Sequence, residues 1–210
     1  MMQALRLQQN PYPGKLITFC GLDGCGKTTL IHRLAELLKS RGEDVVLTKQ
    51  PTDAVRSSEI FRTYMDCENH GAFEYLSLSL LAAGDRVQHT NRVIAPLLAQ
   101  GKTVISDRYF YSCLANLRAR GYREAEWIYE VSEHILSPDL AIFLDVDVQT
   151  AVQRVRSRPK EKERYIDMPL QYALREEYLQ IAARNGGTVI ASNQSEEATF
   201  ERIREIYYGY

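Results

Sequence analysis

The chain has 210 residues, a length that suits one domain with a sizeable core. Its 26 basic and 27 acidic side chains give a net charge of -1, which argues against a general nucleic-acid binder because such proteins carry a basic excess. No apolar run approaches membrane-spanning length, and the four cysteines form neither a Cys-x-x-Cys pair nor a zinc-ligand spacing. We therefore expect a cytoplasmic protein with reduced thiols and with no membrane or nucleic-acid partner.

Short apolar runs alternate with helical patterns along the chain. Residues 1–14 are polar and contain prolines, so we expect a flexible tail ahead of a single domain over 15–210. In chain order the patterns predict strand 16–20, helix 28–40, strand 45–48, helix 57–64, helical region 73–98, strand 104–106, helix 125–136, strand 140–144, helix 148–156, helix 171–183, strand 188–191 and helix 196–208. Pro96 is expected to interrupt the long helical region, and Asp147 is placed to cap the helix that follows it.

The alternation of strands and helices predicts an α/β fold of three layers, with a five-stranded parallel sheet and helices on both faces. The strands read as near-continuous apolar runs, which agrees with burial on both sides. Ligands bind beyond the carboxyl ends of the strands in such sheets. Gln50-Pro51 and Asp107-Arg108 follow predicted strands, so both pairs are expected beside one site.

A glycine-rich segment, Gly-Leu-Asp-Gly-Cys-Gly-Lys-Thr at 21–28, separates the first predicted strand from the first predicted helix. Its glycines let backbone N–H groups wrap phosphate oxygens, and the helix dipole, the Lys27 ammonium and the Thr28 hydroxyl favour triphosphate and Mg²⁺ there. The predicted fold is therefore of the P-loop NTPase type, with ATP and Mg²⁺ expected. Because the sequence holds no guanine-reading Asn-Lys-x-Asp and no protein-kinase His-Arg-Asp, a small kinase with a small phosphorylated acceptor remains.

Charged residues near this loop point to the acceptor. Asp23 lies inside the loop, where a carboxylate beside triphosphate is unfavourable unless it orients the acceptor or contacts Mg²⁺ through water. Asp107 ends the third strand, so Thr28 and Asp107 are the predicted metal ligands. Arg108 is placed to bind a phosphate through two hydrogen bonds. Arg86 either reaches the acceptor or is a structural residue on a solvated helix face.

Basic residues crowd the segment after the fourth strand. The six cations are Arg154, Arg156, Arg158, Lys160, Lys162 and Arg164. Against Glu161 and Glu163 the balance is six minus two, or +4. One interpretation is a solvated charge run. The other, which the position after strand four of a P-loop fold favours, is a mobile lid at about 156–167 whose arginines neutralise the transferring phosphoryl group.

Together these motifs resemble the thymidylate kinase family, whose members transfer the γ-phosphoryl group of ATP to dTMP. The resemblance runs from Lys15 to about Ile206. Its carriers are the loop at 21–29, Asp-Arg-Val-Gln-His at 85–89, Asp-Arg-Tyr-Phe-Tyr-Ser at 107–112, Arg-Val-Arg-Ser-Arg at 154–158 and Ala-Ser-Asn-Gln-Ser at 191–195. An arginine-rich lid combined with Cys25 in the P-loop is similar to the bacterial members that carry the catalytic arginine in the lid. The family is usually homodimeric, so the resemblance implies a homodimer.

The resemblance implies a role for each matching residue. Catalysis is assigned to Lys27, Asp23, Arg108, Arg154 and Arg158. ATP binding is assigned to Gly21, Gly24, Cys25, Gly26, Lys27, Thr28, Thr29, Arg156, Asn193 and Gln194. Acceptor binding is assigned to Asp23, Gln50, Pro51, Arg86, Arg108, Tyr109, Asn116 and Arg164. Within the last set, Asp23 would lie near the sugar 3′-hydroxyl, Arg108 would bind the phosphate and Arg86 would reach the pyrimidine edge.

Three positions depart from the family pattern, and all of them concern the acceptor. Ala82 stands where the family has the phenylalanine that stacks on thymine, Gln50 replaces an acid, and Asn116 stands where an aromatic residue lies near the sugar. The first interpretation is therefore a nucleoside monophosphate kinase acting on dTMP. The alternatives are a kinase of the same fold with another nucleotide or a small phosphorylated or phosphonate acceptor, and a non-catalytic nucleotide-binding regulator.

Overall fold

Five parallel strands form one sheet in the order β2-β3-β1-β4-β5. They are β1 (Leu16–Cys20), β2 (Val45–Lys49), β3 (Thr103–Asp107), β4 (Leu140–Asp145) and β5 (Thr188–Ala191). In this computed structural model, which describes residues 2–209, the central strand β1 pairs with β3 and β4, so that Ile17 lies beside Ile105 on one side and Leu140 on the other. The predicted five-stranded parallel sheet is confirmed.

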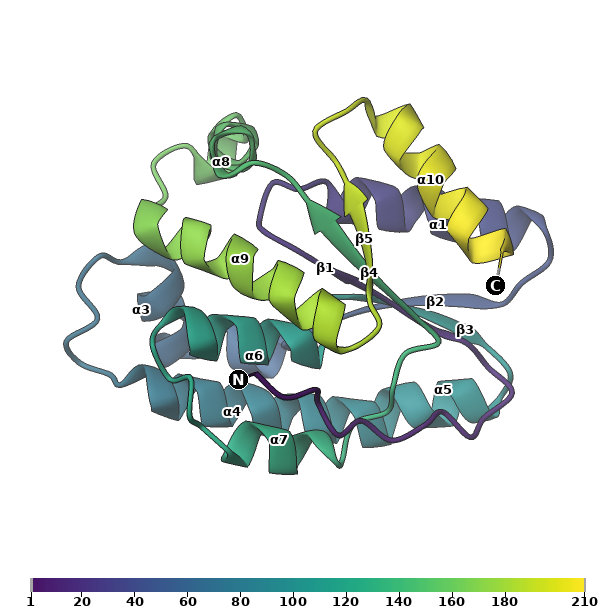
Figure 1. Ribbon diagram of the computed structural model, residues 1–210, viewed down its shortest axis with the longest axis horizontal. Coiled ribbons are helices and arrows are strands. Elements are labelled where there is room, and N and C mark those ends of the chain that lie inside the picture. The colour runs from purple at the N-terminus through teal and green to yellow at the C-terminus, as the bar shows by residue number, and fades with distance from the viewer. Residues whose placement is uncertain (1, 210) are drawn as a thin grey trace.

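Helices cover both faces of this sheet, as three layers require. They are α1 (Lys27–Ser40), α2 (Asp53–Arg56), α3 (Glu59–Asp66), α4 (Tyr75–His89), η1 (Thr90–Ile94), α5 (Ala95–Ala99), α6 (Phe110–Ala119), α7 (Trp127–Ser132), α8 (Val148–Arg156), η2 (Pro159–Glu161), α9 (Met168–Arg184) and α10 (Glu196–Tyr208). Figure 1 shows α1 and α10 on one face, and α4, α5, α6 and α9 on the other. Within residues 2–209, no helix is both long and apolar enough to cross a bilayer.

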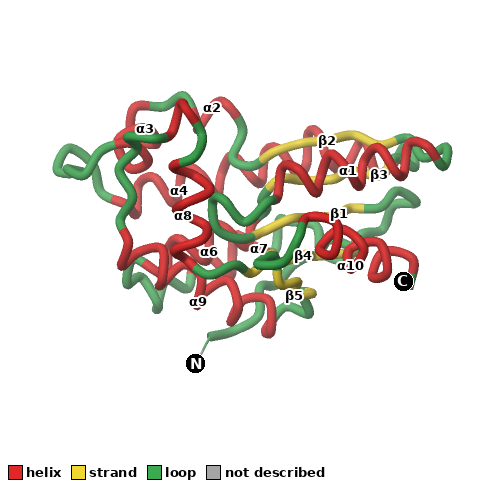
Figure 2. Tube along the Cα trace, turned by 90° about the horizontal axis from the view of Figure 1, so that it is seen from above, coloured by secondary structure: helices red, strands yellow, loops and turns green. Residues whose placement is uncertain are grey.

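The carboxyl ends of the strands all open toward the same end of the molecule. Figure 2 shows α2, α3 and α8 gathered at that end, beyond the strands. The chain segments that follow β1, β2 and β3 therefore meet there, as the parallel topology requires.

The N-terminal segment is not the flexible tail that its composition predicts. Leu5 is buried, and its backbone N–H donates to the Asn185 side chain at 2.8 Å. The backbone of Gln8 pairs with the chain just before β4, accepting from Ser137 N–H at 2.6 Å and donating to the Ile135 carbonyl at 2.9 Å. These hydrogen bonds and the burial of Leu5 fix the segment against the domain.

The helix α6 is absent from the sequence prediction. Eight of its ten residues are buried, so it lacks the polar face that makes a helix visible as a period of 3.6 residues. By contrast, the helix predicted at 125–136 is confirmed only as α7, because residues after Ser132 turn to pair with the N-terminal segment.

Two other helical predictions change in detail. The helix predicted at 57–64 corresponds to α3, which Ser58 caps by accepting from Phe61 N–H, and the short α2 before it was not predicted. The interruption predicted near Pro96 takes the form of the π-helical segment η1 directly before it. Asp147 caps α8 through Thr150 N–H at 2.8 Å, as predicted.

Candidate active site

The loop between β1 and α1 forms a cradle for an anion. Gly21, Gly24 and Gly26 have φ angles of 137°, 86° and 94°, which L side chains rarely adopt. Space is also restricted, because a Cβ on Gly24 would lie 2.2 Å from the Ala151 carbonyl oxygen. Both the positive φ angle and the lack of space for a Cβ atom therefore require glycine at position 24.

Helix α1 starts at this loop without a side-chain cap. Its N-cap is Gly26, so the N–H groups of the first turn remain available to an anion. The Lys27 ammonium is buried and donates to the carbonyls of Gly21 at 3.1 Å and Leu22 at 2.7 Å. Thr28 and Thr29 are exposed and line the cavity described next.

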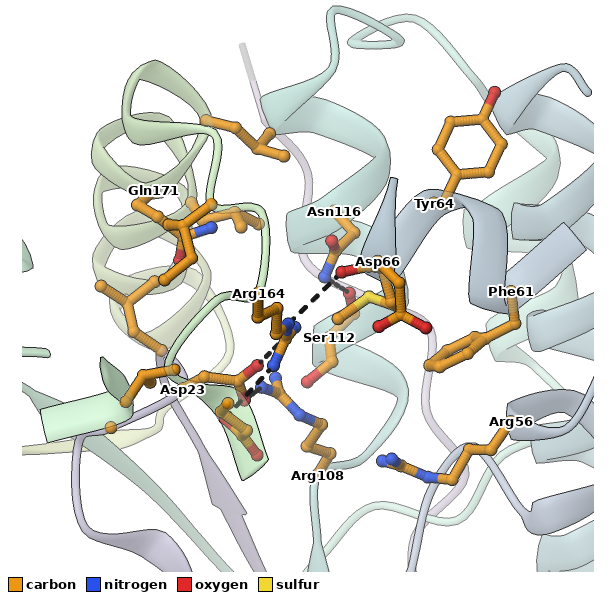
Figure 3. Close-up of a pocket in the computed structure, with 18 of the residues that line it drawn as sticks. Asp23, Arg56, Phe61, Tyr64, Asp66, Arg108, Ser112, Asn116, Arg164 and Gln171 are labelled. Carbon is orange, nitrogen blue, oxygen red and sulfur yellow. Dashed lines mark hydrogen bonds and ion pairs between the residues drawn. The ribbon is translucent and has the colours of Figure 1, made fainter. Parts of the chain in front are cut away.

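A cavity of about 850 Å³ lies in front of this loop. Its walls come from the P-loop, from α2 and α3, from α4 and α6, and from the segment between α8 and α9. Segments far apart in the sequence thus supply one site, and Figure 3 shows their side chains converging.

Asp23 is the centre of the charged cluster in this cavity. Its carboxylate accepts from Arg108 at 2.6 Å and from Arg164 at 3.3 Å, as Figure 3 shows. Burial opposes its ionisation, but the cations of Arg108, Lys27 and Arg164 outweigh burial and hold the pKa of Asp23 well below its usual range. Asp23 is therefore an anion across the physiological pH range.

Arg108 is held by both its backbone and its side chain. Its φ of 68° lies in the left-handed region, and its N–H donates to the Phe19 carbonyl at 2.8 Å. The guanidinium donates to Tyr178 Oη at 2.8 Å as well as to Asp23. Burial disfavours the charge, yet the neighbouring Tyr178, Asp23 and Asp107 keep the pKa of Arg108 well above its usual value.

Asp107 lies on the wall of the cavity beside Lys49 of the neighbouring strand β2. The Lys49 ammonium contacts Asp107 Oδ2 at 3.3 Å. Within residues 2–209, the buried Oδ1 of Asp107 has no hydrogen-bond partner. A buried carboxylate oxygen without a partner is unfavourable, so a cation or an ordered water is the expected neighbour.

Arg86 and Asn116 both line the cavity. Arg86 is 3% exposed and donates to the carbonyls of Ala82 at 2.8 Å and Tyr109 at 3.3 Å, so it is a buried residue and not part of a solvated face. Asn116 donates to the Ser112 carbonyl at 2.9 Å. The side chains are therefore oriented before any acceptor binds.

The lid contributes two of its predicted arginines to the cavity. Arg158 lines it and lies 3.5 Å from Glu161, and Arg164 extends to Asp23. Arg164 also donates to the Met65 carbonyl of α3 at 3.3 Å. A single lid residue thus contacts both the P-loop and α3.

Arg56 and Phe61 line the cavity although no sequence motif pointed to them. The Arg56 side chain donates to the Pro51 carbonyl at 2.8 Å and its guanidinium enters the cavity, as Figure 3 shows. Burial and the nearby charge of Arg108 lower the pKa of Arg56. A signal was present, since Arg56 follows the second strand by few residues, but its direction depends on α2, which has only four residues.

Two residues expected in the acceptor site do not reach the cavity, and these expectations are corrected. Gln50 is fully buried and its side-chain nitrogen contacts His89 Nδ1 at 3.0 Å. Tyr109 is also fully buried, and its hydroxyl donates to the Leu136 carbonyl at 2.8 Å. Both side chains point into the core behind the site, whereas Pro51 does line the cavity.

Several residues expected around ATP lie outside the cavity. Arg154 donates to the Ser192 carbonyl at 3.2 Å and contacts the Gly24 carbonyl at 3.5 Å, which corrects its assignment to the transferring phosphoryl group. Asn193 accepts from Asp147 N–H at 3.1 Å. The other predicted ATP-binding residues that do not line the cavity are the exposed Arg156 and Gln194 and the buried Gly21 and Cys25. Arg154 and Asn193 order the loops that flank the P-loop.

A parallel sheet in this order, with a phosphate cradle after β1, defines the class of P-loop nucleotide-binding proteins. A family model described as thymidylate kinase matches residues 19–203. A probable thymidylate kinase of Thermococcus onnurineus is 41% identical over 169 residues, which cover 78% of this chain and 82% of the relative. A probable thymidylate kinase of Staphylothermus marinus is 30% identical and covers 92% and 94% of the two chains.

The same similarity extends to solved structures. The crystal structure of thymidylate kinase from Ehrlichia chaffeensis superposes with a TM-score of 0.71 at 26% identity, covering 92% of this chain and 98% of that one. The chain belongs to the thymidylate kinase family. It is an ATP-dependent nucleoside monophosphate kinase by that membership.

Proposed function

We propose that the chain transfers the γ-phosphoryl group of ATP to dTMP and releases dTDP and ADP. The observation that carries this proposal is the cluster of Arg56, Arg108 and Arg164 in one cavity with the P-loop. Two of these arginines contact Asp23, which belongs to the P-loop itself. An acceptor phosphate bound by these guanidinium groups therefore lies next to the phosphates of a bound nucleotide. The names of the relatives support dTMP as that acceptor.

The phosphate cradle of the P-loop is the proposed binding site of the phosphoryl donor, ATP. The backbone N–H groups of the loop and of the α1 N-terminus would bind the β- and γ-phosphates. Lys27 would exchange its loop carbonyls for phosphate oxygens and stabilise the charge of the transferring group. No general base is needed, since the acceptor phosphate is already an anion.

The residues present fit a magnesium ion. Mg²⁺ usually takes one or two protein ligands and completes its shell with waters and phosphates. Thr28 and Asp107, whose buried Oδ1 has no partner within residues 2–209, line one cavity and offer such oxygens, and Asp23 lines the same cavity. When bound, the ion would neutralise charge between the β- and γ-phosphates.

The lid is proposed to supply the catalytic cation. Cys25 is an uncharged, buried residue in the P-loop, whereas Arg158 and Arg164 face the cavity from the lid. A guanidinium that closes over the transferring phosphoryl group stabilises its charge in a water-poor site. Arg158 is half-exposed and paired only with Glu161 in the described chain, so it is free to move toward the phosphates.

The acceptor side is proposed to include Arg86, Pro51 and Asn116. Arg86 is buried and rigidly held, which suits recognition of a carbonyl edge of the base. Ala82 keeps an alternative open, namely another small phosphorylated acceptor, because no ring stands at that position of α4. Another nucleotide acceptor would be seen in the assay below as a rate higher than that with dTMP.

A coupled assay of ADP release tests the proposed function. The chain is incubated with ATP, Mg²⁺ and one acceptor from a panel of dTMP, dUMP, dGMP and AMP. We expect dTMP to give the highest rate above the no-acceptor control, and Arg108→Ala to remove it. Arg202→Ala, an exposed arginine of α10 that pairs only with Glu205, is the matched control and should leave the rate unchanged. A dTMP rate equal to the no-acceptor control would contradict the proposal.

We also propose a cytoplasmic homodimer. The exposed side of α4 carries Leu80 and Leu81, which are 49% and 45% exposed. Apolar side chains adjacent on one helix face are typical of subunit interfaces. The four cysteines are unpaired, as in proteins of reducing compartments. Sedimentation equilibrium of the wild-type chain and of Leu81→Glu tests the dimer.

A further inference from the structure

Helix α3 presents apolar side chains to the cavity as well as to the edge of the protein core. None of its eight residues is buried. Phe61 and Met65 are four residues apart, so they lie on one face of the helix, and both line the cavity. An apolar helix face that is not covered by protein is suited to bind the apolar part of a ligand.

Phe61 is the ring of this face that is free for a ligand. The Arg56 guanidinium lies over this ring, 5.8 Å from its centre. Tyr64, by contrast, stacks on His70 with ring centres 4.4 Å apart, packs edge-on against Tyr75, and donates its hydroxyl to the Phe73 carbonyl at 2.7 Å. Figure 3 shows Phe61 directed toward the middle of the pocket and Tyr64 directed away from it.

Helix α4 lines the same cavity in part with short side chains. Ser79 and Ala82 of α4 line it, one helical turn apart, followed by the buried guanidinium of Arg86. The ring that α4 contributes to the cavity, Tyr75, lies one turn before Ser79 and packs edge-on against Tyr64. A planar group between the helices therefore has an aromatic face on the α3 side, small side chains on the α4 side, and a polar donor at its edge.

The phosphate end fixes how a nucleotide lies in this space. Arg56 is in contact with the Phe61 ring on one side and is close enough to Arg108 for the two charges to interact on the other. A phosphate on Arg56 and Arg108 thus places the rest of the acceptor beside Phe61. We propose that the pyrimidine base of the acceptor stacks on Phe61, so that α3 supplies the ring that α4 lacks at Ala82. This assignment rests on the proposed function, since it takes a nucleoside monophosphate as the acceptor.

Substitution of Phe61 tests the assignment. Loss of one base–aromatic stack corresponds to about a 5- to 150-fold loss of affinity. We expect Phe61→Ala to raise KM for dTMP by that factor, with kcat and KM for ATP within about twofold of wild type. Phe61→Leu, which keeps apolar volume without a ring, should lose most of the same factor. Phe61→Trp should retain affinity. Because Phe61 is not buried, these variants should fold, and thermal unfolding checks this.

A comparison of two ligands separates stacking from a general change in the site. Calorimetric binding of dTMP and of deoxyribose 5-phosphate, without ATP, is measured on wild type and Phe61→Ala. We expect Phe61→Ala to weaken only dTMP, because deoxyribose 5-phosphate lacks the base. Equal loss for both ligands, or no loss for dTMP, would overturn the assignment. Binding of dTMP by wild type without turnover would contradict the proposed function instead, and the binding data would still decide the role of Phe61.

Moving the ring across the cavity gives a second test. Ala82→Phe alone should raise KM for dTMP, because two rings then leave too little space for the base. In Phe61→Ala/Ala82→Phe the single ring stands on α4, and we expect KM for dTMP to return to within about fivefold of wild type. If the double variant is no better than Phe61→Ala, and Ala82→Phe alone is neutral, the base does not lie between these two positions.

Discussion

Arg108 allows the chemical role of a side chain to be separated from the conformational role of its backbone. Arg108→Ala removes the proposed acceptor-phosphate ligand and leaves a left-handed φ of 68° in place. Arg108→Gly removes the same side chain but accepts that φ without strain. The two variants should therefore be equally inactive and unequally stable.

The structure sets the expected magnitudes. Loss of a charge-assisted contact to a largely desolvated phosphate is worth about 10²- to 10⁴-fold in kcat/KM for the acceptor. For stability, the Arg108 and Asp23 side chains are 16% and 36% exposed, so the cost of breaking their pair lies below that of a fully buried pair, at about 1–3 kcal/mol. Relief of the left-handed strain should make Arg108→Gly more stable than Arg108→Ala by about 1 kcal/mol.

Two assays measure these effects. Coupled ADP release at saturating ATP gives kcat/KM for dTMP, and urea unfolding gives the free energy of unfolding. KM for ATP should stay within about threefold of wild type in both variants. Near-normal turnover in either variant would refute the role of Arg108, and an Arg108→Gly variant less stable than Arg108→Ala would refute the strain argument.

Three further predictions concern stability and the phosphate cradle. Gly24→Ala should lower the melting temperature and abolish calorimetric ATP binding, because its Cβ would lie 2.2 Å from the Ala151 carbonyl oxygen; unchanged ATP binding would show that the loop adapts. Burial lowers the pKa of His89 below 6.5, so below pH 6.5 the unfolded state binds a proton more readily than the folded state. In urea titrations the free energy of unfolding should therefore fall as the pH falls, by at most about 1.4 kcal/mol per pH unit. His89→Gln should reduce this pH dependence, and an unchanged pH dependence in that variant would exclude His89 as its source. The buried Arg118–Glu177 pair, at 2.6 Å, predicts that Arg118→Met costs about 3–5 kcal/mol in urea unfolding, and that adding Glu177→Leu recovers most of it; a double variant as unstable as the single one would contradict this.

Prediction from sequence worked where a property is local. The strand β1, the glycine loop and the start of α1 are encoded by consecutive residues whose spacing has one physical meaning. The alternation of apolar runs with helical patterns likewise gave the parallel sheet, and Asp147 was recognisable as a cap. Prediction did not work for α6, because a helix that is buried almost all round has no polar face.

For the candidate site, too, the residues of a local motif were predictable from the sequence, whereas the directions of other side chains were not. Asp23, Lys27 and Thr28 could be assigned from one motif, and all three line the cavity. Gln50 and Tyr109 stand beside site residues in the sequence, yet both point into the core. Neighbouring residues of an extended or turning segment point in different directions, so proximity along the chain does not decide which side chain reaches a ligand.

The sequence by itself determined that this protein has a P-loop for a nucleoside triphosphate within a parallel α/β sheet, because the glycine motif and the alternation of strands and helices depend on short-range spacing. Only the tertiary structure decided which cations meet in the cavity in front of the P-loop. Arg56, Arg108 and Arg164 belong to segments that meet only when β2, β3 and the lid are brought to one edge of the sheet. The structure also placed Phe61 in the same cavity as Ala82, because the direction of a ring on α3 depends on how that short helix packs.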